Sequence, residues 1–324
     1  LGFYFFWALP TSSDTYWHLS VGREVAMTKH IPTQDNFVYG SNPTDYPSTE
    51  WLAGLIFYWF SQTFGNYGMP ILRTALGTIT IILFYKTLKL ITKNEWLVCT
   101  SCMVTGYVLG YRLFDRPESF SSAFMALINF FLLQYFLKNK ISNYIFLLPA
   151  IFLAWINIHA YFVLSLPFLF LYLFLTAITK NIKGLFSLAI VNVLVLLTFL
   201  TRYKAITGLF IASSKIYEVH IGEFDTLWQR LLITNGFDLF RQISLDIYVY
   251  FLIFIFFIIG IFPIILKWKK NLPNIIVGCF YLAFLLTPVK IIRLLSPAVL
   301  IGFPYTLNLI YLYQKVSEHN LVYL

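Results

Sequence analysis

Long apolar runs, separated by short polar segments, make up most of the chain after residue 71. Runs long enough to cross a membrane lie at 72–91, 97–113, 119–137, 185–201, 246–266 and 294–313, with a shorter one at 274–289. A transmembrane helix needs about 20 apolar residues, because the hydrocarbon core is about 30 Å thick and each helical residue rises about 1.5 Å. The pattern therefore predicts a series of transmembrane helices.

Three other apolar stretches depart from this length. Residues 144–179 would be about 54 Å long as one helix, so we predict two spans that turn near Asn157–Ala160. Residues 52–64 form only a short run ending before Gly65, a length that favours a helix lying on the membrane surface. Residues 1–10 are apolar but short, and we expect them to be part of a first helix.

Composition and charge agree with a membrane protein and give it an orientation. Hydrophobic residues make up 59% of the chain and charged residues 11%, with a mean hydropathy of +0.75, which excludes an ordinary soluble domain. With 52–64 on the surface, the predicted inner loops hold most lysines and only two acids, as the positive-inside rule expects. This placement predicts ten membrane helices with both ends of the chain inside.

We therefore expect an all-α, polytopic integral membrane protein with one domain over residues 1–324. Its expected parts are a partial first helix (1–10), an outer loop with interfacial helices (11–71), helices two to seven (72–201), a second outer segment (202–245), the last three helices (246–313) and an inner tail (314–324).

The predicted outer side carries the candidate chemistry. Residues 11–50 hold five of the fourteen carboxylates, and Asp14 comes only four residues after the first apolar run. Every arginine also falls on the outer side. A guanidinium presents a planar fork that suits phosphate, so we expect an outer site for an anionic head group. Ion pairing with the outer acids is the alternative role for these arginines, and helix capping is the alternative for Asp14.

Three further features allow more than one interpretation. His159 is predicted at membrane depth, where polar residues often line a functional cavity, although Asn157 could simply satisfy the backbone of a tight helical hairpin. His18 follows Asp14 by one helical turn, and the two could hold a metal with Asp35 or Glu24, although no spacing fixes a third ligand. Cys99 and Cys102 are interpreted as buried apolar thiols inside a span.

The order of residues in the first outer loop resembles that of the GT-C glycosyltransferases, including the protein O-mannosyltransferases and the lipid A aminoarabinose transferase. The likeness covers roughly residues 10–120 and rests on Asp14, Tyr16-Trp17-His18, Gly22-Arg23-Glu24, His30-Ile31-Pro32-Thr33-Gln34-Asp35, Glu50-Trp51-Leu52, Phe64-Gly65 and Arg73. This chain has Glu50-Trp51-Leu52 where those transferases usually have Pro-Pro-Leu, and Thr15 where many have a second acid.

The resemblance implies an enzyme that moves a sugar from a polyprenyl-phosphate carrier to a glycan, lipid or protein acceptor on the outer face, with membrane lipids as surroundings. Asp14 would then act as general base, because the acceptor loses a proton as it attacks the anomeric carbon. The expected substrate-binding residues are His18, Asp35, Arg73, Arg112, Arg116, His159 and Arg293. No cofactor is implied, a divalent metal is left open, and we expect no nucleic acid partner.

We expect the chain in a bacterial inner (plasma) membrane. The competing class is a transporter or a lipid or polysaccharide flippase without glycosyl transfer, whose signs would be charges in mid-span and two matching halves. Here the charges gather at the ends of spans, which favours the enzyme. A non-catalytic assembly subunit is a third reading.

Overall fold

The computed structural model describes residues 14–33, 37, 49–110, 115–138, 143–178 and 182–202. This part of the chain is 87% helical and contains no strand, which confirms the all-α class for it. The α-helices are α2 (Asp14–Thr28), α3 (Trp51–Phe64), α4 (Gly68–Ile91), α5 (Glu95–Gly110), α6 (Glu118–Lys138), α7 (Leu148–Trp155), α8 (Leu166–Ile178) and α9 (Ile182–Leu200). Three short 3₁₀ helices are η1 (Gly65–Tyr67), η2 (Asn143–Leu147) and η3 (Ala160–Ser165).

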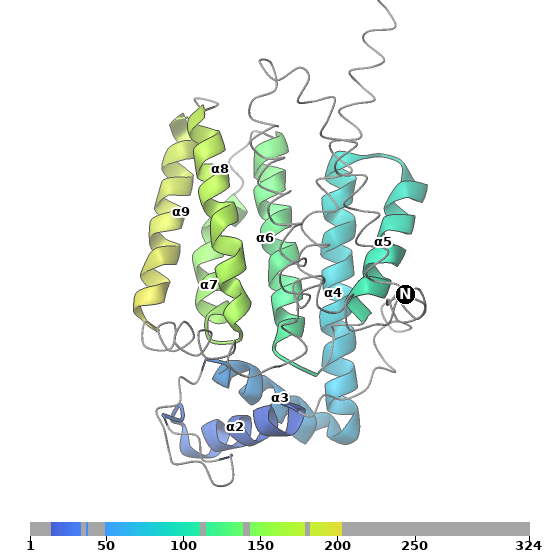
Figure 1. The fold of residues 1–324 in the computed structure, drawn as a ribbon, viewed down its shortest axis with the longest axis vertical. Coiled ribbons are helices and arrows are strands. Elements are labelled where there is room, and N and C mark those ends of the chain that lie inside the picture. The colour runs from blue at the N-terminus through green and yellow to red at the C-terminus, as the bar shows by residue number, and fades with distance from the viewer. Residues whose placement is uncertain are drawn as a thin grey trace, which may run out of the picture.

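The helices form two layers that run in different directions. In Figure 1, α4 to α9 run roughly side by side as a bundle, and α2 and α3 lie across one end of it. Within the bundle α4 packs against α5 and α6, and α9 packs against α7 and α8. We call the layer formed by α2 and α3 the base layer. It carries the residues of the first predicted outer loop to one end of the bundle.

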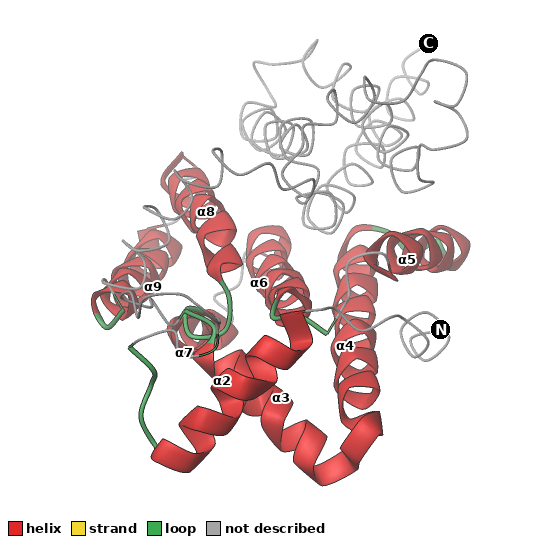
Figure 2. Cartoon of the chain, turned by 60° about the horizontal axis from the view of Figure 1, so that its bottom comes forward, coloured by secondary structure: helices red, strands yellow, loops and turns green. Residues whose placement is uncertain are grey.

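The base layer is held together by a close crossing of two backbones. Helices α2 and α3 cross over one another in Figure 2, and Gly22 meets Gly54 at the crossing. A Cβ built on Gly22 would lie 1.9 Å from the Gly54 carbonyl oxygen, so only glycine fits there. The crossing therefore sets how far α2 lies from α3.

The chain changes direction between the base layer and the bundle. Gly65 has φ of +57°, a conformation that side-chain-bearing residues rarely adopt, and η1 follows it. Helix α4 then runs along the bundle (Figure 1) for 24 residues, about 36 Å at about 1.5 Å per residue. Residues 52–64 are helical as predicted, and they lie across the bundle end.

Two apolar clusters fill the described part. The larger lies between α6, α7, α8 and α9 and is rich in aromatic residues, among them Phe152, Trp155, Phe162 and Tyr172. The smaller joins the base layer to the bundle, with Phe57 of α3 stacked on Phe120 of α6. These ring contacts pack the base layer directly against the bundle.

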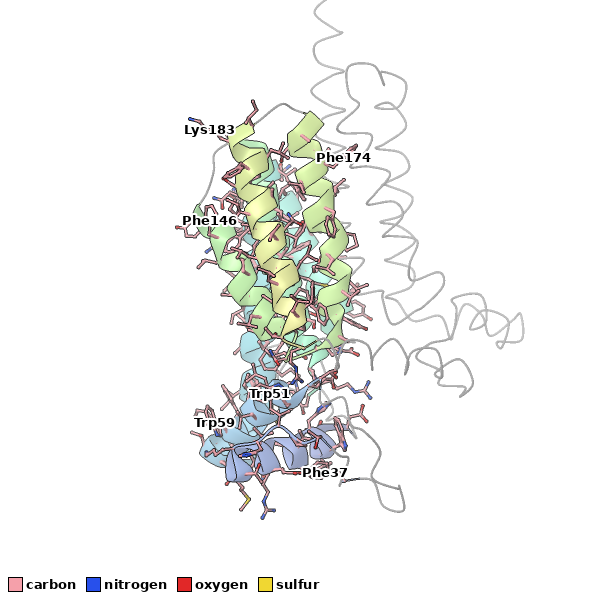
Figure 3. The ribbon with its side chains drawn as sticks, turned by 90° about the vertical axis from the view of Figure 1, so that its left-hand side faces the viewer. Phe37, Trp51, Trp59, Phe146, Phe174 and Lys183 are labelled. Atoms are coloured by element: carbon pink, nitrogen blue, oxygen red, sulfur yellow. The ribbon has the colours of Figure 1, made fainter. Side chains whose placement is uncertain are left out.

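Other apolar side chains point outward from the bundle. Figure 3 shows Phe146 and Phe174 projecting from it, and the outer face of α9 exposes further aliphatic residues. Within the described residues, three helical stretches are long and apolar enough to cross a membrane, namely Trp51–Ile91, Ala160–Ala177 and Ile182–Leu200. An apolar outer surface on such helices indicates a membrane protein.

The break predicted in 144–179 is confirmed. Helix α7 ends at Trp155, residues 156–159 turn, and η3 leads into α8. The Asn157 and His159 amides donate to Ala154 and Trp155 carbonyls, so the turn satisfies its own backbone. The first predicted helix (1–10), the second outer segment (202–245, apart from Arg202) and the last three helices (246–313) lie outside the described residues.

Candidate functional site

The N-terminus of α2 and the start of α6 meet through an ion pair. Asp14 is the first residue of α2, and its Oδ2 lies 2.8 Å from Nη2 of Arg116. The Asp14 side chain is 51% exposed and the Arg116 side chain 17% exposed, so the pair lies at the surface of the site. Two residues that the sequence singled out separately are thus direct neighbours.

A second ion pair lies directly beside the first and is buried. Nη1 of Arg73, in the first turns of α4, donates to Oδ1 of Asp115 at 2.8 Å, and the two side chains are 2% and 0% exposed. The Thr15 hydroxyl donates to the backbone carbonyl of Asp115 at 3.0 Å. Burial raises the pKa of Asp115, and the Arg73 guanidinium opposes that rise. Arg73 therefore ties α4 to the loop before α6.

A third group of side chains surrounds Glu50, the residue before α3. His18 Nε2 lies 3.8 Å from Glu50 Oε2, and His159 Nε2 lies 3.5 Å from Glu50 Oε1. The imidazoles are almost fully buried, whereas the Glu50 side chain is 23% exposed. We call these three residues the His-Glu-His group. It joins α2, the start of α3 and the turn after α7.

A chain of hydrogen bonds fixes the tautomer of His159. The Trp155 indole N–H can only donate, and it donates to Ser121 Oγ at 2.7 Å. Ser121 Oγ lies 2.9 Å from His159 Nδ1, and the Tyr161 amide N–H donates to the same nitrogen at 3.4 Å. A nitrogen that accepts from an amide carries no proton of its own, so the Ser121 hydroxyl also donates to it. Because Nδ1 accepts, the His159 proton is on Nε2 and faces Glu50.

Both histidines are uncharged at neutral pH. Burial lowers the pKa of His18 to about 4, in spite of the nearby Asp14 carboxylate, and Arg116 adds to the lowering. Burial lowers the pKa of His159 to about 3, with a further contribution from His18. Asp14 and Arg116 thus lie close enough to His18 to influence its charge state.

Trp51 and Asn157 position Glu50 relative to His159. The Trp51 indole donates to Asn157 Oδ1 at 2.9 Å, and the Leu52 amide donates to the Asn157 carbonyl at 3.1 Å. Trp51 lies where the base layer meets the bundle in Figure 3. These two bonds fasten the start of α3 to the turn that carries His159, and so they set the distance from Glu50 to His159.

The structure thus brings together Asp14, His18, Arg73, Arg116 and His159, five residues that the sequence pointed to. Asp35, Arg112 and Arg293 lie outside the described residues. The structure pairs Arg73 with Asp115 in the buried interior. Contact between Arg73 and a ligand stays a prediction, and the burial of Arg73 disfavours it. Sequence reasoning did not select Glu50, Asp115 or Ser121 as site residues. For Glu50 the available signal was its place among the five carboxylates of residues 11–50, directly before the apolar run that forms α3.

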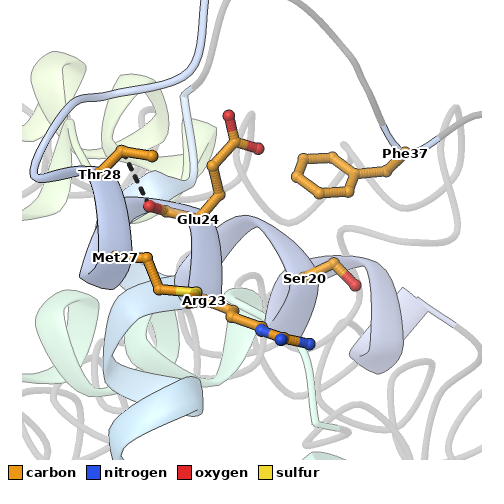
Figure 4. A pocket seen from close by; sticks show the side chains of 6 residues that line it. All are labelled: Ser20, Arg23, Glu24, Met27, Thr28 and Phe37. Carbon is orange, nitrogen blue, oxygen red and sulfur yellow. Dashed lines mark hydrogen bonds between the residues drawn. The ribbon is translucent and has the colours of Figure 1, made fainter.

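Among the described residues, no three histidine, cysteine or acidic side chains are arranged to hold a metal ion. A separate shallow pocket of about 370 Å³ lies along the outer side of α2 (Figure 4). It is lined by Ser20, Arg23, Glu24, Met27, Thr28 and Phe37. It shares no residue with the ion pairs or with the His-Glu-His group, so we treat it as a separate feature of the base layer.

Comparison with known proteins adds no assignment. No family model, no curated protein and no solved structure matches this chain.

Proposed function

We propose that the chain is a membrane glycosyltransferase that moves a sugar from a polyprenyl-phosphate carrier to an acceptor, with Asp14 as general base and Arg116 at the phosphate. The observation that carries the proposal is the Asp14–Arg116 pair at 2.8 Å, at the end of a bundle of apolar helices. A base and a phosphate-binding cation must lie side by side for this reaction, because bond formation and bond breakage occur at the same anomeric carbon.

The reaction assigns each group a role. An acceptor hydroxyl attacks the anomeric carbon and loses its proton to the Asp14 carboxylate. The bond from that carbon to the phosphate oxygen breaks, and the polyprenyl phosphate leaves with the electron pair. Growing charge on the leaving phosphate is stabilised by Arg116, whose planar guanidinium carries five N–H donors and can hold a carboxylate and a phosphate together.

The base layer suits a lipid-borne substrate. It lies across one end of the bundle, and its helices expose Tyr16 and Trp59, aromatic residues typical of a membrane interface; η1, which follows α3, exposes Tyr67. A prenyl chain in the bilayer would then present its phosphate at the level of Arg116. In this proposal the site lies on the outer face of the membrane and the full fold has about ten spans, as the distribution of lysine predicts.

Transfer can be tested with the purified chain in detergent. The probes are radiolabelled polyprenyl-phosphate hexoses and pentoses, supplied with membrane lipid and glycan acceptors. We expect transfer by the unmodified chain, and Asp14→Asn should lower turnover by about 10²-fold or more while binding of polyprenyl phosphate persists. Glu24→Gln is the control, because Glu24 is an acid on the same helix that lies away from the Asp14–Arg116 pair.

Two outcomes would overturn the proposal. Near-normal turnover in Asp14→Asn would remove Asp14 from the mechanism. Absence of transfer, combined with movement of a polyprenyl-phosphate lipid between the leaflets of proteoliposomes, would favour the flippase class instead.

A further inference from the structure

We propose that Glu50 recognises the sugar, accepting hydrogen bonds from its hydroxyl groups while Arg116 holds the phosphate of the same donor. This inference rests on the proposed glycosyl transfer and assigns the site two ends, one for an anion and one for hydroxyl groups.

Exposure singles out Glu50 as the member of the His-Glu-His group that a ligand can reach. The His18 and His159 side chains are each 5% exposed, and Glu50 is 23% exposed. The carboxylate lies between two buried imidazoles that come from different elements, with the Nε2 atoms of His18 and His159 3.8 Å and 3.5 Å from its oxygens, so the rings limit where it can move. A pre-positioned carboxylate loses little conformational freedom when it binds a ligand.

The direction of the hydrogen-bond chain explains what kind of ligand Glu50 would take. Trp155 donates to Ser121, Ser121 donates to His159, and the His159 Nε2–H faces the carboxylate. These dipoles favour negative charge on Glu50 without cancelling it, since both imidazoles are uncharged at neutral pH. A retained negative charge repels phosphate and attracts hydroxyl donors.

The phosphate end and the hydroxyl end of the site lie close together along α2. Asp14 and His18 lie one turn apart on α2, about 6 Å along the helix axis. Arg116 contacts Asp14, and Glu50 lies beside His18. The phosphate end and the hydroxyl end are therefore adjacent along one face of α2, as they must be for a sugar phosphate.

Aromatic rings complete the hydroxyl end. The Trp51 indole follows Glu50 directly and is oriented by Asn157, and the Tyr161 ring packs edge-on against His159 at 4.4 Å between centroids. Carbohydrate rings present apolar C–H faces together with hydroxyl groups, so a carboxylate beside aromatic side chains matches their chemistry.

The test compares a polyprenyl phosphate without a sugar with three lipids that carry one. Dissociation constants are measured in detergent for undecaprenyl phosphate and for undecaprenyl-phosphate hexoses with glucose, galactose or mannose. We expect the unmodified chain to bind at least one hexose-bearing lipid more tightly than the bare phosphate. Glu50→Gln should weaken that binding by about 10-fold or more, as for loss of a charge-assisted hydrogen bond, and leave the bare phosphate within about twofold.

Two further variants separate recognition from folding. Glu50→Asp keeps the charge and shortens the side chain, so it should fold and still lose part of the preference for the sugar-bearing lipid. Glu95→Gln changes an acid at the start of α5, at the end of the bundle away from the base layer. It should alter neither the affinity for undecaprenyl phosphate nor that for the sugar-bearing lipids.

Each remaining outcome is decisive. Equal binding of all four lipids by the unmodified chain would overturn the inference, and so would a Glu50→Gln variant that keeps the preference for sugar. A Glu50→Gln variant that loses both lipids equally would reduce Glu50 to a structural role. Transfer that depends on Asp14 would sustain the glycosyltransferase proposal in all three cases, so the two ideas fail separately.

Discussion

Substitution of Gly22 by alanine tests whether the helix crossing of the base layer positions the site. The added Cβ would lie 1.9 Å from the Gly54 carbonyl oxygen, 2.3 Å from its carbonyl carbon and 2.9 Å from the Leu55 amide nitrogen. All three atoms belong to the backbone of α3, so no side chain can rotate away. The two helices must therefore separate by roughly 1 Å or more before the contact becomes tolerable.

Two effects of the substitution oppose one another. Alanine is favoured over glycine inside a helix by up to about 1 kcal/mol. Overpacking against a rigid neighbour costs about 1–3 kcal/mol, and here it also separates two docked helices. We therefore expect Gly22→Ala to lower the free energy of unfolding in spite of its better helix propensity.

The same displacement reaches the site. His18 is carried by α2 and Glu50 lies at the start of α3, with Nε2 and Oε2 3.8 Å apart. A shift of about 1 Å in α2 would break this contact and move Asp14 with it, and a misplacement of that size can cost about 10²-fold in rate. Turnover should fall together with stability.

Thermal unfolding in detergent and glycosyl transfer are the two assays. Ser20→Ala is the matched control on α2, because the Ser20 hydroxyl bonds only within its own helix, to the Tyr16 carbonyl at 2.9 Å. Gly54→Ala should behave like Gly22→Ala, since its Cβ would lie 2.6 Å from the His18 carbonyl oxygen. An unfolding midpoint and turnover equal to those of the control would show that the crossing does not position the site.

Two more perturbations address the buried charges. Arg73→Met leaves the Asp115 carboxylate buried without its cation and should lower the free energy of unfolding by about 3–5 kcal/mol. Arg73→Met combined with Asp115→Leu should recover much of this loss, as measured by denaturant unfolding. Additive losses would contradict this coupling. Acidification should also destabilise the chain. Above pH 6.5 both histidines are neutral in the folded and in the unfolded chain. Below pH 6.5 the unfolded chain binds protons at both positions, whereas in the folded chain His18 and His159, with pKa values of about 4 and about 3, stay neutral until the pH is much lower. Each histidine should lower the free energy of unfolding by about 2 kcal/mol between pH 7 and pH 5. His159→Asn removes one of the two groups, so it should show about half the pH dependence in thermal unfolding. A stability that rises towards pH 5 would be inconsistent with neutral buried imidazoles.

The sequence by itself determined the local features of the chain. Helix was expected over 72–91, 119–137 and 185–201, and the structure places α4, α6 and α9 there with ends that differ by a few residues. The break near Asn157 was also expected, because no single helix of that length fits a bilayer. These features follow from the length and period of apolar runs, which depend on residues close to one another in the chain.

Only the tertiary structure decided which charged groups meet. The sequence gathered arginines and acids on one side, but it did not show that Asp14 pairs with Arg116 while Arg73 pairs with Asp115. Nor did it place Glu50 beside His159, which lies more than a hundred residues further along the chain. The Asp14–Arg116 and Glu50–His159 contacts require the base layer to dock on the bundle, and the Trp51–Asn157 contact fastens that docking. Within the base layer, the meeting of Gly22 and Gly54 sets how α2 lies on α3. Residue type and spacing predict which groups could interact, and only the packing of distant helices selects the pairs that do.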